Sequence, residues 1–212
     1  MSQHLFADNS IAPIVPVITF HDLAHVAPLT SALVESGLTT LEITLRTEVG
    51  IDAIQQARSL HPGIVIGAGT VTTPDDAAQA SAAGADFLIS PGFSPDVLDF
   101  TADLDIPFIP GVATASELQH ANSMGVDVVK LFPVAHIGGI DLLQALASVW
   151  PAVHFVPTGG ITQATATTYL QHPAVVAVGG SWMIPQSAIA ARDWTTISEL
   201  AVQAYNLTGF GQ

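Results

Sequence analysis

The amino-acid sequence predicts a single (β/α)8 barrel of the TIM barrel class. Short apolar runs recur about every 23 residues, and each is separated from the next by a stretch of helical length. No Asn-Gly or Asp-Gly hairpin dipeptide joins two runs, so we expect successive strands to be parallel and connected through helices. The length of 212 residues fits one such barrel, and residues 1–212 are therefore expected to form one domain. A doubly wound open sheet is the alternative arrangement.

Each apolar run is expected to form one strand of the sheet. The runs begin near Ile14, Thr40, Ile64, Phe87, Phe108, Asp127, His154 and Val175. Three of the intervening stretches carry helix-start signals, which are Thr73-Pro-Asp-Asp76, Ser94-Pro-Asp96 and the capping box Thr114-Ala-Ser-Glu117. These signals place helices between the strands, as a barrel requires.

Helix ends are marked by glycines that fall just before a predicted strand, where a left-handed residue often terminates a helix. These glycines are Gly37, Gly63, Gly84 and Gly125. Residues 2–10 precede the first strand, and we expect them to form a short N-terminal helix or arm.

The charge and composition exclude several classes of partner. Eighteen acidic residues against four basic ones give a formal net charge of −14, which repels nucleic acid and anionic membranes. Cysteine is absent, so disulfides and thiolate chemistry are excluded. The N-terminus has no basic leader, and prolines and glycines interrupt the uncharged stretch 142–191 before it reaches a membrane-spanning length. We therefore expect a cytoplasmic protein.

The histidines do not predict a metal site. His21 and His25 are four residues apart, a spacing that can bind a metal on a helix, but no third ligand accompanies them. Roles at a helix start or on the surface are favoured, and no metal is expected.

Lys130 is the one lysine of the chain, and it lies in the apolar segment Asp127-Val-Val-Lys-Leu-Phe-Pro133. On a strand, Val128, Lys130 and Phe132 share one face, and Val129 and Leu131 share the other. Burial disfavours the charged form of an amine, and a neutral amine can attack a carbonyl to form a Schiff base. The alternative is an amphipathic lysine whose stem packs while its ammonium group reaches water.

The second predicted strand points charged groups toward the barrel axis. In Leu41-Glu-Ile-Thr-Leu-Arg46, the side chains of Glu42, Thr44 and Arg46 alternate with apolar ones. Inward charges are costly unless they pair or serve a ligand. Arg46 can bind a substrate carboxylate, and Glu42 can move protons near a lysine. A Glu–Arg pair that only stabilises the barrel is the alternative.

Glycine-rich turns follow three predicted strands. Thr70 ends the third strand and offers a hydroxyl at the barrel mouth, and Phe132 and Pro91 are candidates to wall the pocket. The seventh and eighth strands end in glycine pairs just before a helical stretch, where barrels of this class bind phosphate. The candidate phosphate ligands are Thr158, Gly159, Gly160, Gly180 and Ser181. No Lys or Arg lies near these turns in the sequence, so backbone N–H groups and hydroxyls would hold the phosphate.

These motifs together resemble the 2-keto-3-deoxy-6-phosphogluconate (KDPG) and 4-hydroxy-2-oxoglutarate (KHG) aldolase family along nearly the whole chain. The matching stretches are Val15-Pro-Val-Ile18, Leu41-Glu-Ile-Thr-Leu-Arg-Thr47, Gly67-Ala-Gly-Thr-Val71, Ile89-Ser-Pro-Gly92, Ile109-Pro-Gly111, Lys130-Leu-Phe-Pro133, Pro157-Thr-Gly-Gly-Ile161 and Gly179-Gly-Ser-Trp182. One departure follows Pro133, where many relatives have Ala-Glu or Gly-Glu and this chain has Val134-Ala135.

The resemblance implies a class I aldolase that needs no metal or other cofactor and acts on a keto-acid sugar phosphate. Lys130 is similar to the family's Schiff-base lysine and Glu42 to its general acid and base. Arg46 and Thr70 resemble the carboxylate-binding pair, and Phe132 the wall beside the pyruvyl unit. The family is usually homotrimeric. The uncharged predicted helix at residues 162–168 is a candidate subunit contact, and a drift in composition without any contact is the alternative.

Three alternatives remain open at this point. KHG or the galactonate epimer of KDPG is an alternative main substrate within the aldolases. A phosphosugar isomerase or epimerase, or a non-catalytic sugar-phosphate binding protein, would share the phosphate turns without needing an iminium.

Overall fold

The computed structural model describes residues 13–209, and within them strands alternate with helices along the chain. The predicted N-terminal helix or arm at residues 2–10 lies outside the described residues. The strands are β1 (Ile14–Ile18), β2 (Thr40–Thr44), β3 (Val65–Gly69), β4 (Phe87–Ile89), β5 (Phe108–Ile109), β6 (Gly111–Val112), β7 (Val128–Leu131), β8 (His154–Pro157) and β9 (Val178–Gly180). The helices are α2 (Val26–Glu35), α3 (Gly50–Leu60), α4 (Pro74–Ala82), α5 (Pro95–Asp103), α6 (Ala115–Ser123), α7 (Gly139–Val149), α8 (Gln163–Leu170), α9 (Gln186–Ala191) and α10 (Trp194–Asn206), with short 3-10 helices η1 (Leu23–His25) and η2 (Val134–His136).

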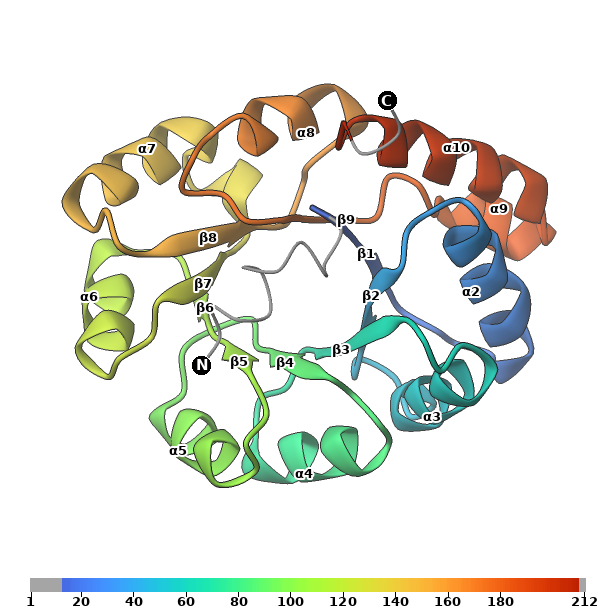
Figure 1. Ribbon diagram of the computed structural model, residues 1–212, viewed down its shortest axis with the longest axis horizontal. Helices are drawn as coiled ribbons and strands as arrows, with labels where there is room; N and C mark the ends of the chain where they lie inside the picture. The colour runs from blue at the N-terminus through green and yellow to red at the C-terminus, as the bar shows by residue number, and fades with distance from the viewer. Residues whose placement is uncertain (1–12, 210–212) are drawn as a thin grey trace.

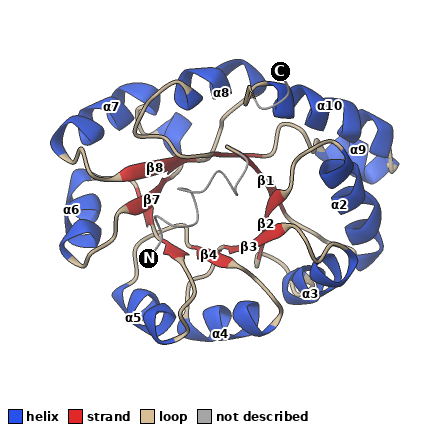
Figure 2. Ribbon diagram, viewed as in Figure 1, coloured by secondary structure: helices blue, strands red, loops and turns tan. Residues whose placement is uncertain are grey.

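The strands lie at the centre and the helices surround them (Figures 1 and 2). All strand pairs are parallel, and they form a six-stranded sheet of order β5-β4-β3-β2-β1-β9 and a three-stranded sheet of order β6-β7-β8. Parallel strands bring their carboxyl ends to the same edge, so the residues at those ends meet although they are distant in sequence.

The predicted fifth strand is divided in the structure. Pro110 separates β5, which pairs with β4, from β6, which pairs with β7. Because proline has no N–H to donate, it cannot continue the ladder on that side, although its carbonyl accepts from the Lys130 N–H at 2.9 Å. The last predicted strand also begins later than expected, since Val175 contributes an isolated bridge and β9 starts at Val178.

Two hydrophobic layers follow from the alternation of side chains along the strands. Leu41 and Ile43 of β2 pack in one cluster between strands and helices, and Val129 and Leu131 of β7 pack in a second. A smaller inner cluster joins Val15, Phe87, Ile89, Ile109, Val128, Val156 and Ala177. The predicted faces of β2 and β7 are thereby confirmed, and the inner face is the one that carries Glu42 and Lys130.

The predicted helix starts are confirmed. The hydroxyls of Thr73, Ser94 and Thr114 each accept a hydrogen bond from the third following backbone N–H, and the first and last belong to full capping boxes. These caps fix where α4, α5 and α6 leave the carboxyl edge of the strands.

Three of the four predicted helix-ending glycines have positive φ, namely Gly37 at 94°, Gly84 at 96° and Gly125 at 85°. The prediction for Gly63 is wrong, because that residue does not adopt a left-handed conformation. Helix α3 already ends at Leu60, His61 caps it with φ −131°, and Pro62 prevents its continuation before Gly63 is reached. Among the described residues, no helix is long and apolar enough to cross a membrane.

Candidate active site

The centre of the candidate site is a buried pair formed by Lys130 of β7 and Glu42 of β2. Lys130 Nζ donates a hydrogen bond to Glu42 Oε1 at 3.0 Å, and the side chains are 3% and 1% exposed. The ammonium also lies 5.4 Å from the centroid of the Phe132 ring. An amine and a carboxylate in direct contact, with almost no water around them, form a unit that can pass a proton from one to the other.

The neighbouring strand leaves room for the Glu42 carboxylate. Gly69 of β3 lies beside β2, and a Cβ at this position would collide with Glu42 Oε1. The glycine at the end of the third predicted strand therefore permits the carboxylate to lie between the strands, where Lys130 reaches it. The Glu–Arg pair that the sequence left open is not formed, since Glu42 pairs with Lys130.

Arg46 and Thr70 lie together at the carboxyl edge of β2 and β3. Arg46 Nε donates to Thr70 Oγ1 at 3.2 Å, and the Arg46 side chain is exposed. Thr70 has φ of 63°, a left-handed conformation that β-branched residues rarely adopt. Such backbone strain is concentrated at functional sites. Here it accompanies a hydroxyl that meets the guanidinium.

A cavity of about 230 Å³ lies at the same edge of the strands. It is lined by Val17, Arg46, Phe132, Thr158, Gly159, Gly160, Ile161, Gly180, Ser181 and Trp182. All five predicted phosphate ligands therefore line one cavity together with Arg46 and with Phe132, whose ring is the one near the Lys130 ammonium. Lys130, Glu42 and Thr70 are not among the lining residues, and Phe132 is the residue that connects the buried pair to the cavity.

The glycine turn after β8 depends on positive φ angles. Gly159 has φ of 96° and Gly160 has φ of 78°, conformations in which backbone N–H groups can converge on an anion. Thr158 is buried, and the isolated bridge from Thr158 to Gly179 ties this turn to the one after β9. The two glycine turns thus form one surface at the base of the cavity.

Sequence reasoning missed Val17, Ile161 and Trp182 as lining residues. Trp182 packs over Gly180, where any Cβ would collide with the indole ring. Its position directly after the Gly-Gly-Ser turn was the available signal. Pro91 is not among the residues that line the cavity; it follows β4, and its carbonyl lies where a Cβ of Gly111 would be. Its role beside the pyruvyl unit stays a prediction.

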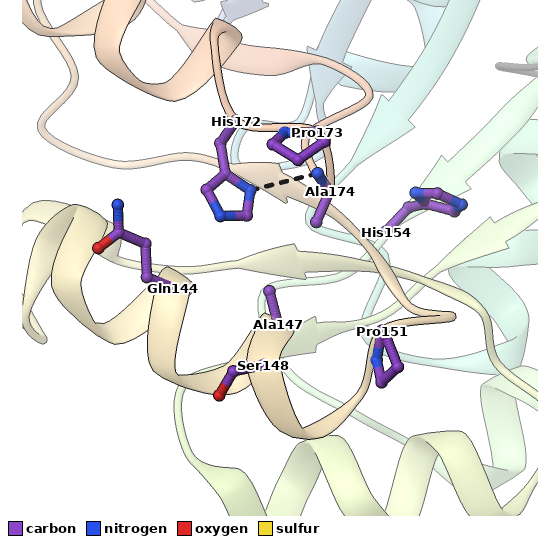
Figure 3. Close-up of a pocket in the computed structure, with 8 residues that line it drawn as sticks. All are labelled: Gln144, Ala147, Ser148, Pro151, His154, His172, Pro173 and Ala174. Atoms are coloured by element: carbon purple, nitrogen blue, oxygen red, sulfur yellow. Dashed lines mark hydrogen bonds between the residues drawn. The ribbon is translucent and has the colours of Figure 1, made fainter.

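A second cavity, of about 350 Å³, contains none of the predicted site residues. Gln144, Ala147, Ser148, Pro151, His154, His172, Pro173 and Ala174 line it, from α7 and from the segments that enter β8 and β9 (Figure 3). It therefore lies at the amino ends of the strands, whereas the Lys130–Glu42 pair and the glycine turns lie toward the carboxyl ends. No cluster of three or more His, Cys, Asp or Glu suited to a metal ion occurs among residues 13–209.

A family model described as "KDPG and KHG aldolase" matches residues 8–200 of the chain. The 2-dehydro-3-deoxy-phosphogluconate aldolase of Treponema pallidum is 42% identical over 92% of this chain and 93% of the relative. The KHG/KDPG aldolase of Escherichia coli K12 is 42% identical over 91% of this chain and 90% of the relative.

Solved structures give the same result. The KDPG aldolase of Legionella pneumophila, with pyruvate captured at low pH as a covalent carbinolamine intermediate, has a TM-score of 0.90 and 42% identity, covering 95% of this chain and 97% of that chain. The aldolase of Zymomonas mobilis ZM4 with 3-phosphoglycerate has a TM-score of 0.91 and 37% identity, covering 98% of this chain and 97% of that chain.

Proposed function

Because the chain belongs to the KDPG and KHG aldolase family, we propose that it is a class I aldolase that cleaves 2-dehydro-3-deoxy-6-phosphogluconate to pyruvate and glyceraldehyde 3-phosphate. The observation that carries this proposal is the buried contact between Lys130 Nζ and Glu42 Oε1. Capture of pyruvate as a carbinolamine in the Legionella relative supports an amine as the nucleophile of the family.

The reaction begins when Lys130 Nζ, having passed a proton to Glu42, adds to the C2 ketone of the substrate. Glu42 returns this proton to the carbinolamine hydroxyl, which leaves as water and gives an iminium between C2 and the lysine nitrogen. The Glu42 carboxylate, directly or through a water, then takes the proton of the C4 hydroxyl, and the C3–C4 bond breaks to release glyceraldehyde 3-phosphate. The electron pair of that bond forms a double bond between C2 and C3, and the iminium becomes a neutral enamine. Protonation at C3 and hydrolysis of the iminium release pyruvate and restore the amine.

The remaining site residues bind the two ends of the substrate. Arg46 and Thr70 hold the carboxylate, with the guanidinium supplying the positive charge and Phe132 packing on the pyruvyl unit. At the other end, the phosphate lies on the turns Thr158–Gly160 and Gly180–Ser181, held by backbone N–H groups and the two hydroxyls. The lysine carries the carbonyl chemistry, so the mechanism requires no cofactor.

Reduction with borohydride in the presence of pyruvate tests the mechanism. The reduced imine adds the mass of pyruvate less one oxygen, and peptide mapping should place this adduct on Lys130. Because Lys130 is the one lysine of the chain, the α-amino group at the N-terminus is the only competing primary amine. A Lys130→Met variant should remain unlabelled, and a wild-type protein that stays unlabelled would exclude the Schiff-base mechanism.

A second substrate within the same chemistry is favoured by the Escherichia coli relative, which is named for both KHG and KDPG. Turnover of KDPG, of KHG and of the galactonate epimer ranks the three substrates. A phosphosugar isomerase or epimerase would turn over its substrate without a borohydride-trapped adduct, and a binding protein would turn over none.

The architecture behind this function is proposed to be a closed (β/α)8 barrel formed by residues 1–212 as one domain. Closure is supported on one side by Pro110, which alone separates β5 from β6. On the other side, the isolated bridges Phe155–Val175 and Thr158–Gly179 connect β8 to the chain of β9. We further propose a homotrimer in the cytoplasm, where phosphorylated sugar acids are retained by their charge. A monomeric mass in solution would contradict the trimer.

A further inference from the structure

The loop that follows the candidate Schiff-base lysine lies directly on the candidate phosphate turn. Val134 N–H donates to Thr158 O at 2.9 Å, and Ala135 N–H donates to Gly159 O at 3.0 Å. These bonds continue the pairing of β7 with β8, in which Leu131 lies opposite Pro157, past the ends of both strands. The backbone of η2 is therefore fixed against the glycine turn, and the side chains of η2 have a defined place relative to it.

One of those side chains is the imidazole of His136. His136 Nε2 lies 3.6 Å from the point that a Cβ of Gly160 would occupy, and Ala135 Cβ lies 2.6 Å from the same point. His136 is exposed, and none of the side-chain hydrogen bonds within residues 13–209 involves its ring. A ring nitrogen with free hydrogen-bonding capacity thus lies beside the turn that lines the cavity.

The cavity is short of positive charge for a phosphorylated substrate. A phosphate monoester carries a charge of roughly −1.5 to −2 near neutral pH, and the whole chain carries −14. Arg46 is the one Lys or Arg that lines the cavity. Arg58 pairs with Asp86, and Lys130 pairs with Glu42. An imidazole at the phosphate turn adds a hydrogen-bond donor there.

We propose that His136 is a specificity-determining residue, whose Nε2 donates to the phosphate bound at the Gly159–Gly160 turn and makes the enzyme prefer phosphorylated substrates. This proposal rests on the proposed aldolase function, since it assigns a ligand to one end of that substrate. The segment from Lys130 to His136 then spans the substrate, with the amine at C2 and the imidazole at the phosphate.

The experiment compares His136→Ala and His136→Gln with the wild-type enzyme on KDPG and on the same keto acid without its phosphate. Loss of one hydrogen bond to a charged group should raise KM for KDPG about tenfold in His136→Ala, with kcat little changed. The unphosphorylated substrate should change by less than about twofold, and inhibition by inorganic phosphate should weaken about as much as KDPG binding. His136→Gln, which keeps an N–H donor, should recover part of the loss.

His120→Ala is the matched control, because His120 is an exposed histidine of α6 that packs edge-on against Phe93. Neither histidine is among the residues that line the cavity, but His136 lies beside Gly160 of the glycine turn. Equal losses on both substrates in His136→Ala would assign the residue a structural role in the loop and overturn the proposal, as would no change on either substrate. Borohydride trapping with pyruvate, which has no phosphate, should be unaffected in every variant. Failure of trapping in the wild-type enzyme would instead overturn the aldolase function.

Discussion

Lys130 and Glu42 each depend on the other to remain charged inside the protein. Their side chains are 3% and 1% exposed, so neither is stabilised by solvent, and the contact of 3.0 Å is the compensation that the structure provides. The same contact serves the proposed chemistry, because the lysine must lose a proton before it can attack and a carboxylate is in place to accept it. Stability and catalysis are therefore coupled at this pair, and each can be tested separately.

Removing one partner of the pair is expected to cost more stability than removing both. Lys130→Met leaves the Glu42 carboxylate buried without a counter-charge and should lower the free energy of unfolding by about 3 kcal/mol. The double variant Lys130→Met/Glu42→Met replaces the pair by apolar groups and should recover most of that loss. Urea denaturation followed by circular dichroism measures both values. A double variant no more stable than the single one would contradict this account.

Replacing Glu42 by glutamine keeps the shape and removes the ability to accept a proton. Glu42→Gln should lower kcat by about 10²- to 10⁴-fold, which is the usual contribution of a positioned general acid or base. Steady-state kinetics on KDPG, together with the rate of borohydride trapping, measures the effect. Glu35→Gln at the exposed end of α2 is the control and should retain wild-type activity. Glu42→Gln activity within about twofold of wild type would exclude this proton-transfer role.

At the level of the helices, α4 shows how a local signal fixes an element that leaves the active-site edge. The Thr73 hydroxyl accepts from the Asp76 N–H at 3.1 Å, and Asp76 accepts from the N–H groups of Thr72 and Thr73. Partial burial raises the pKa of Asp76, but the hydrogen bonds from Thr72 and Thr73 together outweigh it and lower the pKa below 3.8. The charged carboxylate is thus the form that the folded state favours.

This depressed pKa predicts how the capping contribution changes with pH. Because the folded-state pKa lies below the unfolded value of about 3.9, the stabilisation is fully present above that value and is lost as pH falls through the folded-state pKa. Asp76→Asn should lower the free energy of unfolding by about 1 kcal/mol or less near neutral pH, since the carboxylate is partly solvated. The difference should shrink below about pH 4. Urea denaturation at a series of pH values measures this difference in the free energy of unfolding, and Asp75→Asn in the same turn is the control.

Such local signals explain which elements the sequence could predict. A capping residue or an apolar run determines the structure of only the few residues next to it in the chain. Thr73, Ser94 and Thr114 therefore start helices as expected. Pro110 acts through its neighbours instead: the strand breaks because the ladder on one side requires an N–H, and this depends on which strand lies there. The prediction that Gly63 ends a helix is wrong because α3 has already ended at Leu60, before Pro62.

The candidate site likewise contains residues that the sequence could predict and one that it could not. Glu42, Lys130, Arg46 and Thr70 could be grouped from sequence because strand alternation and the shared carboxyl edge of parallel strands bring such residues together. The position of His136 could not, since it follows from two hydrogen bonds between the β7–α7 loop and the β8–α8 turn. Nothing in the local sequence records which glycine turn that loop would contact.

For the molecule as a whole, most of the four Lys and Arg side chains make specific contacts, so they offset little of the acidic surface charge. Lys130 is buried against Glu42, and Arg58 donates to the carbonyls of Pro62, Ile64 and Gly84 while it pairs with Asp86. Arg46 lines the cavity. Arg192, which caps α9, is exposed and does not line the cavity. A substrate with a carboxylate and a phosphate therefore approaches a protein of net charge −14, and Arg46 is the one Lys or Arg that it meets in the cavity.

This charge distribution predicts an unusual response of the enzyme to salt. Raising the ionic strength shortens the Debye length from about 30 Å at 0.01 M to about 8 Å at physiological salt, which screens the long-range repulsion more than the short-range attraction of Arg46. The value of kcat/KM for KDPG should therefore rise, or fail to fall, with added salt. The same keto acid without its phosphate carries less charge and should show a smaller rise. Steady-state kinetics in a chloride series measures both slopes, and a steep fall for KDPG would reveal a positive funnel that outweighs the acidic surface.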